Sequence, residues 1–175
     1  PDLYTVAIDV LKAGADSITV HLREDRRHIK DLDLKILSSD KSIPINLEIA
    51  SDQKMIDIAL KYKPSFICLV PEKRNEVTTE GGLNLKKNKN KIKKIIEILN
   101  RNNIRTSLFI NPSLQDIKLS KILGSKCIEI HTGKISNQIK QKKNYSKELN
   151  KIKKCAFYAN KIGLEVHAGH GMDYK

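Results

Sequence analysis

Short runs of apolar and β-branched residues alternate along this chain with longer stretches whose apolar residues recur at helical spacing. Helical patterns cover residues 3–13, 29–37, 53–62, 90–102, 114–123 and 146–162. Strand-like runs lie beside them at 17–22, 45–49, 66–70, 105–110, 127–131 and 164–167. Such alternation is typical of repeated strand–helix units around a parallel sheet, so we predict an α/β fold.

The residues at the ends of these segments support the same division. Gly14, Gly124 and Gly163 each follow a helical pattern, where a C-cap glycine belongs, and each leads into the next strand. Ser113, with Asp116 three residues later, predicts an N-terminal capping box. The six units are therefore separated by ordinary helix start and stop signals.

Repeated units of this kind close into a barrel or form an open, doubly wound sheet. No Gly-x-Gly-x-x-Gly follows the first strand, whereas polar side chains stand at the carboxyl end of nearly every strand, as in a barrel's active site. We therefore predict a TIM (β/α)8 barrel of which this chain carries about six strands. We expect its first strand to precede Pro1 and its last strand–helix unit to follow Lys175, leaving residues 1–175 as a single incomplete domain.

Three of the strands place titratable side chains among apolar neighbours. His21 and Arg23 share one face of the first strand, and Glu48 and Glu129 are each flanked by apolar residues. A carboxylate in such a position is costly to bury unless it is paired or used. General acid–base catalysis is one interpretation; ion pairs with lysine or arginine, and a merely hydrogen-bonded histidine, are the alternatives.

Two further segments carry candidate chemistry. Residues 71–82 form a polar loop with threonines, cations and paired glycines, which suits a mobile cover that binds anions, although an ordinary surface loop has the same composition. His167 and His170 lie three residues apart near the end of the chain. Because the zinc pattern His-Glu-x-x-His is absent, we favour His170 as a proton donor over a metal site.

Composition excludes several other classes of protein. The chain has 33 Lys+Arg against 20 Asp+Glu, a net charge of +13, but the lysines are dispersed without interleaved aromatics, so we interpret them as a solvated surface rather than a nucleic-acid interface. Three widely spaced cysteines indicate neither a disulfide framework nor a zinc site. No apolar run approaches the roughly 18 residues of a membrane span, and no signal peptide is visible, so we expect a cytoplasmic protein.

Five segments, in order, together strongly resemble the pyridoxine 5'-phosphate synthase family, and the match covers essentially the whole chain. They are His-Leu-Arg-Glu-Asp-Arg-Arg-His-Ile at 21–29, Asn-Leu-Glu at 46–48, Leu-Val-Pro-Glu-Lys-Arg-Asn-Glu-Val-Thr-Thr-Glu-Gly-Gly-Leu at 69–83, Glu-Ile-His-Thr-Gly at 129–133 and Ala-Gly-His-Gly at 168–171.

The resemblance implies a TIM barrel with extra helices that acts in vitamin B6 synthesis. Such enzymes condense 3-amino-2-oxopropyl phosphate with 1-deoxy-D-xylulose 5-phosphate, close the pyridine ring and release phosphate and water. It also implies a cytoplasmic homo-octamer without organic cofactor or metal.

Matching motif positions assigns roles to eight residues. The resemblance implies that His21 and Glu48 accept protons, that His170 donates one and that Glu129 stabilises the transition state. It further implies that deoxyxylulose phosphate is bound by Arg23, His28 and Thr78, and the amino-ketone phosphate by the backbone of Gly171.

The family's first-strand Asn-x-Asp-His element and its last phosphate-binding turn do not occur in this sequence. We therefore expect residues 1–175 alone to be inactive. A different sugar-phosphate barrel enzyme and a nonenzymatic basic module that binds nucleic acid remain as alternatives.

Overall fold

A computed structural model describes residues 2–73, 76–78 and 81–173 of the chain. Within these residues, parallel strands alternate with helices, and each strand pairs with the next one in sequence to give the order β1-β2-β3-β4-β5-β6. The strands are β1 (Ile18–His21), β2 (Ile45–Ala50), β3 (Phe66–Val70), β4 (Arg105–Ile110), β5 (Cys127–His131) and β6 (Glu165–Gly169). The helices are α1 (Leu3–Lys12), α2 (Asp31–Ser39), α3 (Gln53–Tyr62), α4 (Lys89–Arg101), α5 (Leu114–Ile122), α6 (Gly133–Lys140) and α7 (Ser146–Lys161).

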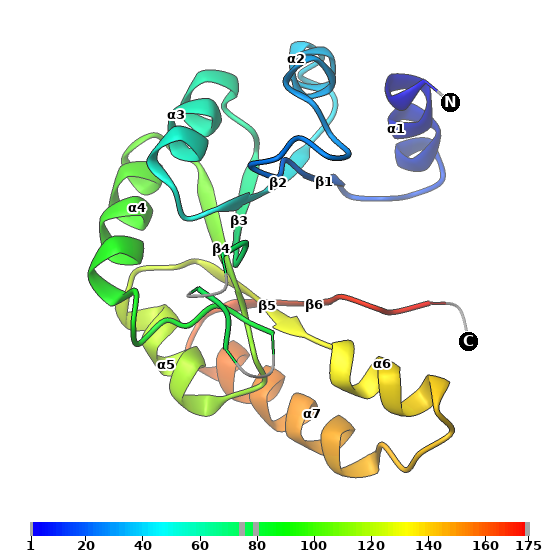
Figure 1. Ribbon diagram of the computed structural model, residues 1–175, viewed down its shortest axis with the longest axis vertical. Helices are drawn as coiled ribbons and strands as arrows, with labels where there is room; N and C mark the ends of the chain where they lie inside the picture. The colour runs from blue at the N-terminus through cyan, green and yellow to red at the C-terminus, as the bar shows by residue number, and fades with distance from the viewer. Residues whose placement is uncertain (1, 74–75, 79–80, 174–175) are drawn as a thin grey trace.

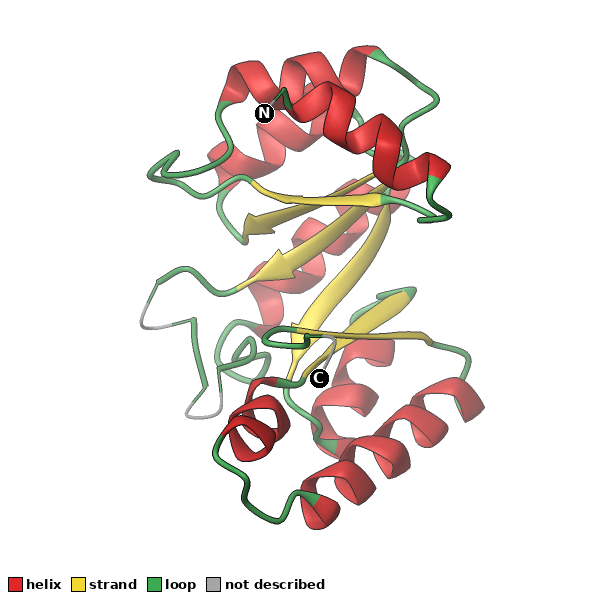
Figure 2. Cartoon of the chain, turned by 90° about the vertical axis from the view of Figure 1, so that its right-hand side faces the viewer, coloured by secondary structure: helices red, strands yellow, loops and turns green. Residues whose placement is uncertain are grey.

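The sheet is curled, and its helices lie on the outer side. Figure 1 shows α2, α3, α4, α5 and α7 in an arc around the strands. The view turned by 90° shows the strands from the side that these helices leave uncovered (Figure 2). Six neighbouring parallel strands with helices outside a curled sheet form the wall of a half-barrel, in agreement with the prediction from the sequence.

Alternation along each strand separates an apolar outer face from a polar inner face. Leu47 and Ile49 of β2 are fully buried, whereas Asn46 and Glu48, which alternate with them, are only partly buried. The same apolar side continues through the other strands and packs with the helices into one large hydrophobic core. The burial of this face fixes the strand register, because a shift by one residue would exchange the two faces.

The register brings one inner-facing residue of each strand into a row. Each residue of this row is paired with the next across neighbouring strands: His21, Glu48, Cys68, Ser107, Cys127 and Glu165. Local signals at the helix ends match the sequence too. Gly14, Gly124 and Gly163 have φ angles of 103°, 90° and 74°, and the Ser113 side chain accepts a hydrogen bond from the Asp116 amide.

Two elements differ from the prediction. Helix α6 was not predicted, because its sequence Gly-Lys-Ile-Ser-Asn-Gln-Ile-Lys offers only two apolar residues and little helical pattern. Strand β6 ends at Gly169, two residues beyond the predicted end, because pairing with β5 continues to His131. The longer strand matters for the site, because it places His170 directly at the carboxyl edge of the sheet. Among the described helices, none is both long and apolar enough to cross a membrane.

Candidate active site

A cavity of about 550 Å³ opens on the inner face of the sheet. All six strands contribute to its lining, which combines hydroxyl, amide, carboxylate, thiol and imidazole groups with few apolar ones. Because parallel strands of a barrel end at the same rim, side chains at their carboxyl ends meet above this cavity. Of the predicted site residues, Glu48 and Glu129 line the cavity from within β2 and β5, whereas positions 21, 23, 28, 78, 170 and 171 lie at or beyond the carboxyl ends of their strands.

His21 and Glu48 are brought together from neighbouring strands. His21 is the last residue of β1 and pairs in register with Glu48 of β2. The imidazole Nδ1 lies 3.8 Å from Glu48 Oε2, and the two side chains are 32% and 22% exposed. Two side chains that can carry a proton therefore face each other where β1 and β2 lie side by side.

Glu129 of β5 completes a group of acidic side chains on this face. Burial, and secondarily the charge of Glu129, raise the pKa of Glu48, while burial raises the pKa of Glu129. Glu129 Oε2 lies 3.7 Å from the Cys68 thiol, which donates to it. The contacts observed are with His21 for Glu48 and with the Cys68 thiol for Glu129, neither of which is the lysine or arginine that the ion-pair interpretation invokes.

The two cysteines in apolar strand runs have different environments. Cys68 is buried in a small hydrophobic cluster with Val70 and Phe109 while its thiol donates to Glu129, and Cys127 lines the cavity. The three cysteines are buried and free in the structure.

His170 lies immediately beyond β6 in a constrained backbone. Its φ angle is 80°, a region that non-glycine residues rarely adopt. The carbonyls on either side of this turn are held by the Thr132 hydroxyl, which donates to Gly169 O at 2.5 Å and to His170 O at 2.9 Å, and by the Ser136 hydroxyl, which donates to Gly171 O. The site thus presents the predicted proton donor on a strained turn fixed by β5 and α6.

The predicted phosphate contacts are less completely assembled. The Arg23 guanidinium is turned to Asp25, with both nitrogen–oxygen distances at 3.1 Å, and His28 is exposed in the loop that follows β1. Thr78 is anchored, because its hydroxyl accepts a hydrogen bond of 2.6 Å from Asn111 Nδ2. Residues 74–75 and 79–80 of the loop expected to cover the site lie outside the described residues.

Three residues of the site were given no role by the sequence reasoning. Glu72 contacts His21, Asn111 binds the loop at Thr78 and Gly82, and His131 stacks on His170. Asn111 and His131 stand at the carboxyl ends of β4 and β5, so the rule of polar residues at strand ends could have found them. No local pattern distinguishes Glu72 from other acidic loop residues.

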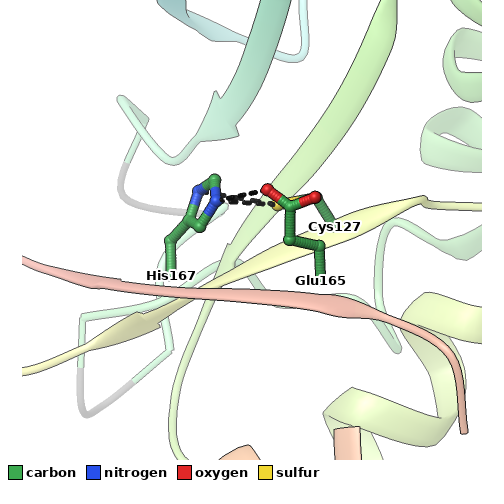
Figure 3. A group of neighbouring side chains, drawn as sticks. All are labelled: Cys127, Glu165 and His167. Carbon is green, nitrogen blue, oxygen red and sulfur yellow. Dashed lines mark hydrogen bonds and ion pairs between the residues drawn. The ribbon is translucent and has the colours of Figure 1, made fainter. Parts of the chain in front are cut away.

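The two histidines near the end of the chain do not form a common site. His167 lies with Glu165 and Cys127 toward the amino ends of β5 and β6, where the ligand-type atoms of these three side chains are within 4.8 Å of one another (Figure 3). Glu165 already pairs with the Arg105 guanidinium, whose positive charge disfavours a bound cation there. Burial also raises the pKa of the Cys127 thiol, which keeps it protonated.

Known proteins of similar sequence share one description. The family described as "Pyridoxal phosphate biosynthesis protein PdxJ" matches residues 1–175. A pyridoxine 5'-phosphate synthase of Pelagibacter ubique is 61% identical over 175 residues, covering 100% of this chain and 73% of the relative. The enzyme of the same name from Bdellovibrio bacteriovorus is 45% identical, with coverages of 100% and 72%.

Solved structures agree on the fold. A D-psicose 3-epimerase from Clostridium cellulolyticum H10, solved with D-tagatose, aligns with a TM-score of 0.60 at 10% identity, over 97% of this chain and 68% of that one. Likeness at so low an identity shows the fold alone, and it confirms the TIM-barrel class. By these sequence matches, over its whole length, the chain belongs to the PdxJ family of pyridoxal phosphate biosynthesis proteins.

Proposed function

We propose that this protein is a pyridoxine 5'-phosphate synthase that condenses 3-amino-2-oxopropyl phosphate with 1-deoxy-D-xylulose 5-phosphate. The observation that carries the proposal is the meeting of His21, Glu48 and Glu129 on one inner face, in a chain of this family. Ring closure by this route needs imine formation, enolisation, dehydration and phosphate elimination. Each of these steps moves a proton, so several acids and bases must surround one cavity.

The proposed roles follow from where each group stands. His21 and Glu48 act as proton acceptors, and the raised pKa of Glu48 lets it both take up and return a proton nearer neutral pH. Glu129 stabilises positive charge that develops on the amine or imine nitrogen during condensation. His170, on its strained turn at the cavity rim, donates the proton to a leaving oxygen.

The proposed phosphate contacts use charge and backbone. Arg23 binds the phosphate of deoxyxylulose phosphate by exchanging Asp25 for phosphate oxygens, which its planar fork fits in the same way. His28 and Thr78 add contacts to the same substrate, and the backbone at Gly171 binds the amino-ketone phosphate. These assignments agree with a rim that surrounds a cavity large enough for small phosphorylated sugars.

The direct test uses the full-length protein with both phosphorylated substrates. Pyridoxine 5'-phosphate is followed by its absorbance and inorganic phosphate by a coupled assay, with the variants Glu48→Gln and His170→Asn beside the parent. Product from the parent and its loss from both variants support the reaction and its site. A folded full-length protein that forms no product while turning over another sugar phosphate overturns the proposal in favour of that related barrel chemistry.

We also infer a cytoplasmic homo-oligomer, an octamer by family resemblance, built from one barrel domain per chain. Leu3, Val6 and Val10 of α1 expose apolar surface at helical spacing, which suits burial against another protein surface. Light scattering on the full-length protein reads the number of subunits. A monodisperse monomer at micromolar concentration would contradict the oligomer.

A further inference from the structure

We propose that Glu72 is a positioning residue for His21, which it holds with the ring proton on Nε2 so that Nδ1 is the atom that accepts a proton. The inference rests on the function proposed for His21. It concerns which ring nitrogen of His21 accepts the proton and which contact determines this.

Glu72 is well placed to orient the imidazole. It lies two residues beyond β3, and its side chain is only 6% exposed. One carboxylate oxygen, Oε1, is 3.1 Å from His21 Nε2. The other, Oε2, accepts a hydrogen bond of 2.9 Å from the backbone amide of Glu24. Both carboxylate oxygens of Glu72 therefore have a hydrogen-bond partner, and the carboxylate cannot rotate without losing one of them.

The backbone that carries Glu72 is held in turn by a second buried carboxylate. Glu76 Oε2 accepts hydrogen bonds of 3.3 Å from the amides of Glu72 and Lys73. Its Oε1 accepts from the Ser51 hydroxyl at 2.9 Å and from Lys91 Nζ at 3.2 Å. Hydrogen bonds from four groups fix this acidic turn against β2 and α4, so Glu72 projects toward His21 from a rigid support.

The chemistry of the two partners selects the tautomer. An ionised carboxylate only accepts hydrogen bonds, so His21 Nε2 carries the proton that bridges to Glu72. In the neutral ring the lone pair then lies on Nδ1, which faces Glu48. Because Nδ1 and Glu48 Oε2 are 3.8 Å apart, beyond hydrogen-bond distance, Nδ1 is left available to take a proton from a substrate that approaches both groups.

A competing interpretation gives Glu72 only the task of anchoring its loop to the segment after β1. Glu24 offers a matched control for that task, because its side chain pairs with Lys73 of the same loop at 3.1 Å without touching His21. Removal of either contact loosens the loop. Only the loss of the Glu72 carboxylate changes which nitrogen of the His21 imidazole carries the proton.

Glu72→Gln separates the two interpretations, because an amide has a single oxygen. If that oxygen keeps the Glu24 amide, the Gln NH2 faces His21 Nε2, and the ring must move its proton to Nδ1 to accept the new hydrogen bond. The variant keeps the size of the side chain, so the loop retains its packing. We therefore expect Glu72→Gln to invert the tautomer of His21.

The experiment labels full-length protein with ¹⁵N-histidine and records ¹⁵N solid-state NMR spectra at about pH 8.5, above the ordinary imidazole pKa of about 6.5. His21→Asn assigns the His21 signals by their loss. We expect a protonated Nε2 and an unprotonated Nδ1 in the parent and in Glu24→Gln, and the reverse in Glu72→Gln. In steady-state assays, kcat of Glu72→Gln should fall about 10- to 100-fold, the range found for residues that orient a functional histidine, with KM within about twofold.

Three results would overturn the proposal: a parent protonated at Nδ1, an unchanged tautomer in Glu72→Gln, or a Glu24→Gln variant with the same loss of kcat. Failure of the proposed function gives a different pattern. If the parent forms no pyridoxine 5'-phosphate, or if His21→Asn keeps full turnover, the catalytic role of His21 is wrong whatever its tautomer is.

Discussion

The ring of His170 stacks on that of His131, with centroids 4.7 Å apart and an interplanar angle of 29°. His131 is itself fixed, because its Nδ1 accepts a hydrogen bond of 3.1 Å from the Gly133 amide and its ring lies 5.0 Å from that of Phe109. The proposed proton donor, which is exposed at the end of β6, thus obtains its orientation from an aromatic cluster on β4 and β5.

Removal of the His131 ring should therefore weaken catalysis without unfolding the chain. An aromatic pair contributes about 0.5–1.5 kcal/mol, so we expect His131→Asn, which keeps an acceptor for the Gly133 amide, to lower kcat about two- to tenfold. His131→Phe keeps the stack and should stay nearer the parent rate. A greater loss of kcat in His131→Phe than in His131→Asn would mean that the hydrogen bond, not the stacking, orients His170.

The buried carboxyls should make stability fall as the pH rises. The pKa of Glu129 is raised above 4.5 in the folded chain, so between that value and the raised one the folded state binds the proton more tightly than the unfolded state. The free energy of unfolding therefore decreases across this window and stays lower above it. The decrease is about 1.4 kcal/mol for each tenfold difference in proton affinity between the folded and unfolded states.

Glu129→Gln has no group to ionise and should exceed the parent in stability at pH 7.5, with little difference at pH 4. Urea denaturation at the two pH values measures this. Glu97→Gln, on the exposed side of α4, serves as the control for the removal of a carboxylate that is not buried. A Glu129→Gln variant that is less stable than the parent at pH 7.5 contradicts burial as the cause of the raised pKa.

Gly169 should be required by the site rather than by the fold. A Cβ at this position would collide with Glu129 Oε1 and displace the carboxylate, so we expect Gly169→Ala to lower kcat at least about tenfold. Gly14 shows the opposite behaviour, because nothing lies near its Cβ position but its φ is +103°. Gly14→Ala should lose about 1 kcal/mol of stability at an unchanged kcat. Turnover and urea titrations on both variants test the pair.

Asn111 should control substrate affinity through the loop that carries Thr78. Its amide donates to the Thr78 hydroxyl at 2.6 Å, and its Oδ1 accepts from the Gly82 amide at 3.0 Å. Loss of both bonds in Asn111→Ala should raise KM for deoxyxylulose phosphate more than it lowers kcat. Asn111→Asp should be milder, because the carboxylate still accepts from Gly82 and the Thr78 hydroxyl can turn to donate. Unchanged KM in the alanine variant would remove Thr78 from the binding site.

Asp25 competes with substrate phosphate for Arg23. The hydrogen bond from Arg23 lowers the pKa of Asp25 to about 2, so Asp25 remains ionised at every assay pH. Asp25→Asn should weaken this pairing and lower KM for deoxyxylulose phosphate severalfold, equally at pH 6 and pH 9. Initial rates across a substrate series measure the change. A rise in KM would show that Asp25 orients Arg23 for phosphate instead of competing for it.

The alternation of apolar and polar residues within single strands made much of this architecture predictable. Leu47 and Ile49 on one side, with Asn46 and Glu48 on the other, indicate both the strand and its two environments. Helix α6 escaped prediction because its buried residues are Gly133 and Ser136, which carry no apolar pattern, and its two isoleucines stand in a lysine- and asparagine-rich background. Helix α6 can begin only after β5 ends at His131, the residue that pairs with Gly169 of β6.

The site was predictable where a residue's own strand positions it. Glu48 and Glu129 were found because each interrupts an apolar run. Glu72 was not, because its partner His21 is 51 positions away and the contact exists only once β3 lies beside β2 and β1. The pairing of Arg23 with Asp25 could not be predicted from the sequence pattern either, because an arginine side chain can reach several acidic groups in this loop.

The two faces of the same curled sheet divide stability from catalysis. The hydrophobic core packs between the outer face and the helices, while the described candidate residues stand at the inner face and its rim. Substitution of an inner residue can therefore alter the reaction without removing core packing. Substitution of an outer residue can alter the melting temperature without affecting a substrate contact. In such a sheet the inner residues that determine the reaction can be substituted while the outer residues that determine the fold are retained.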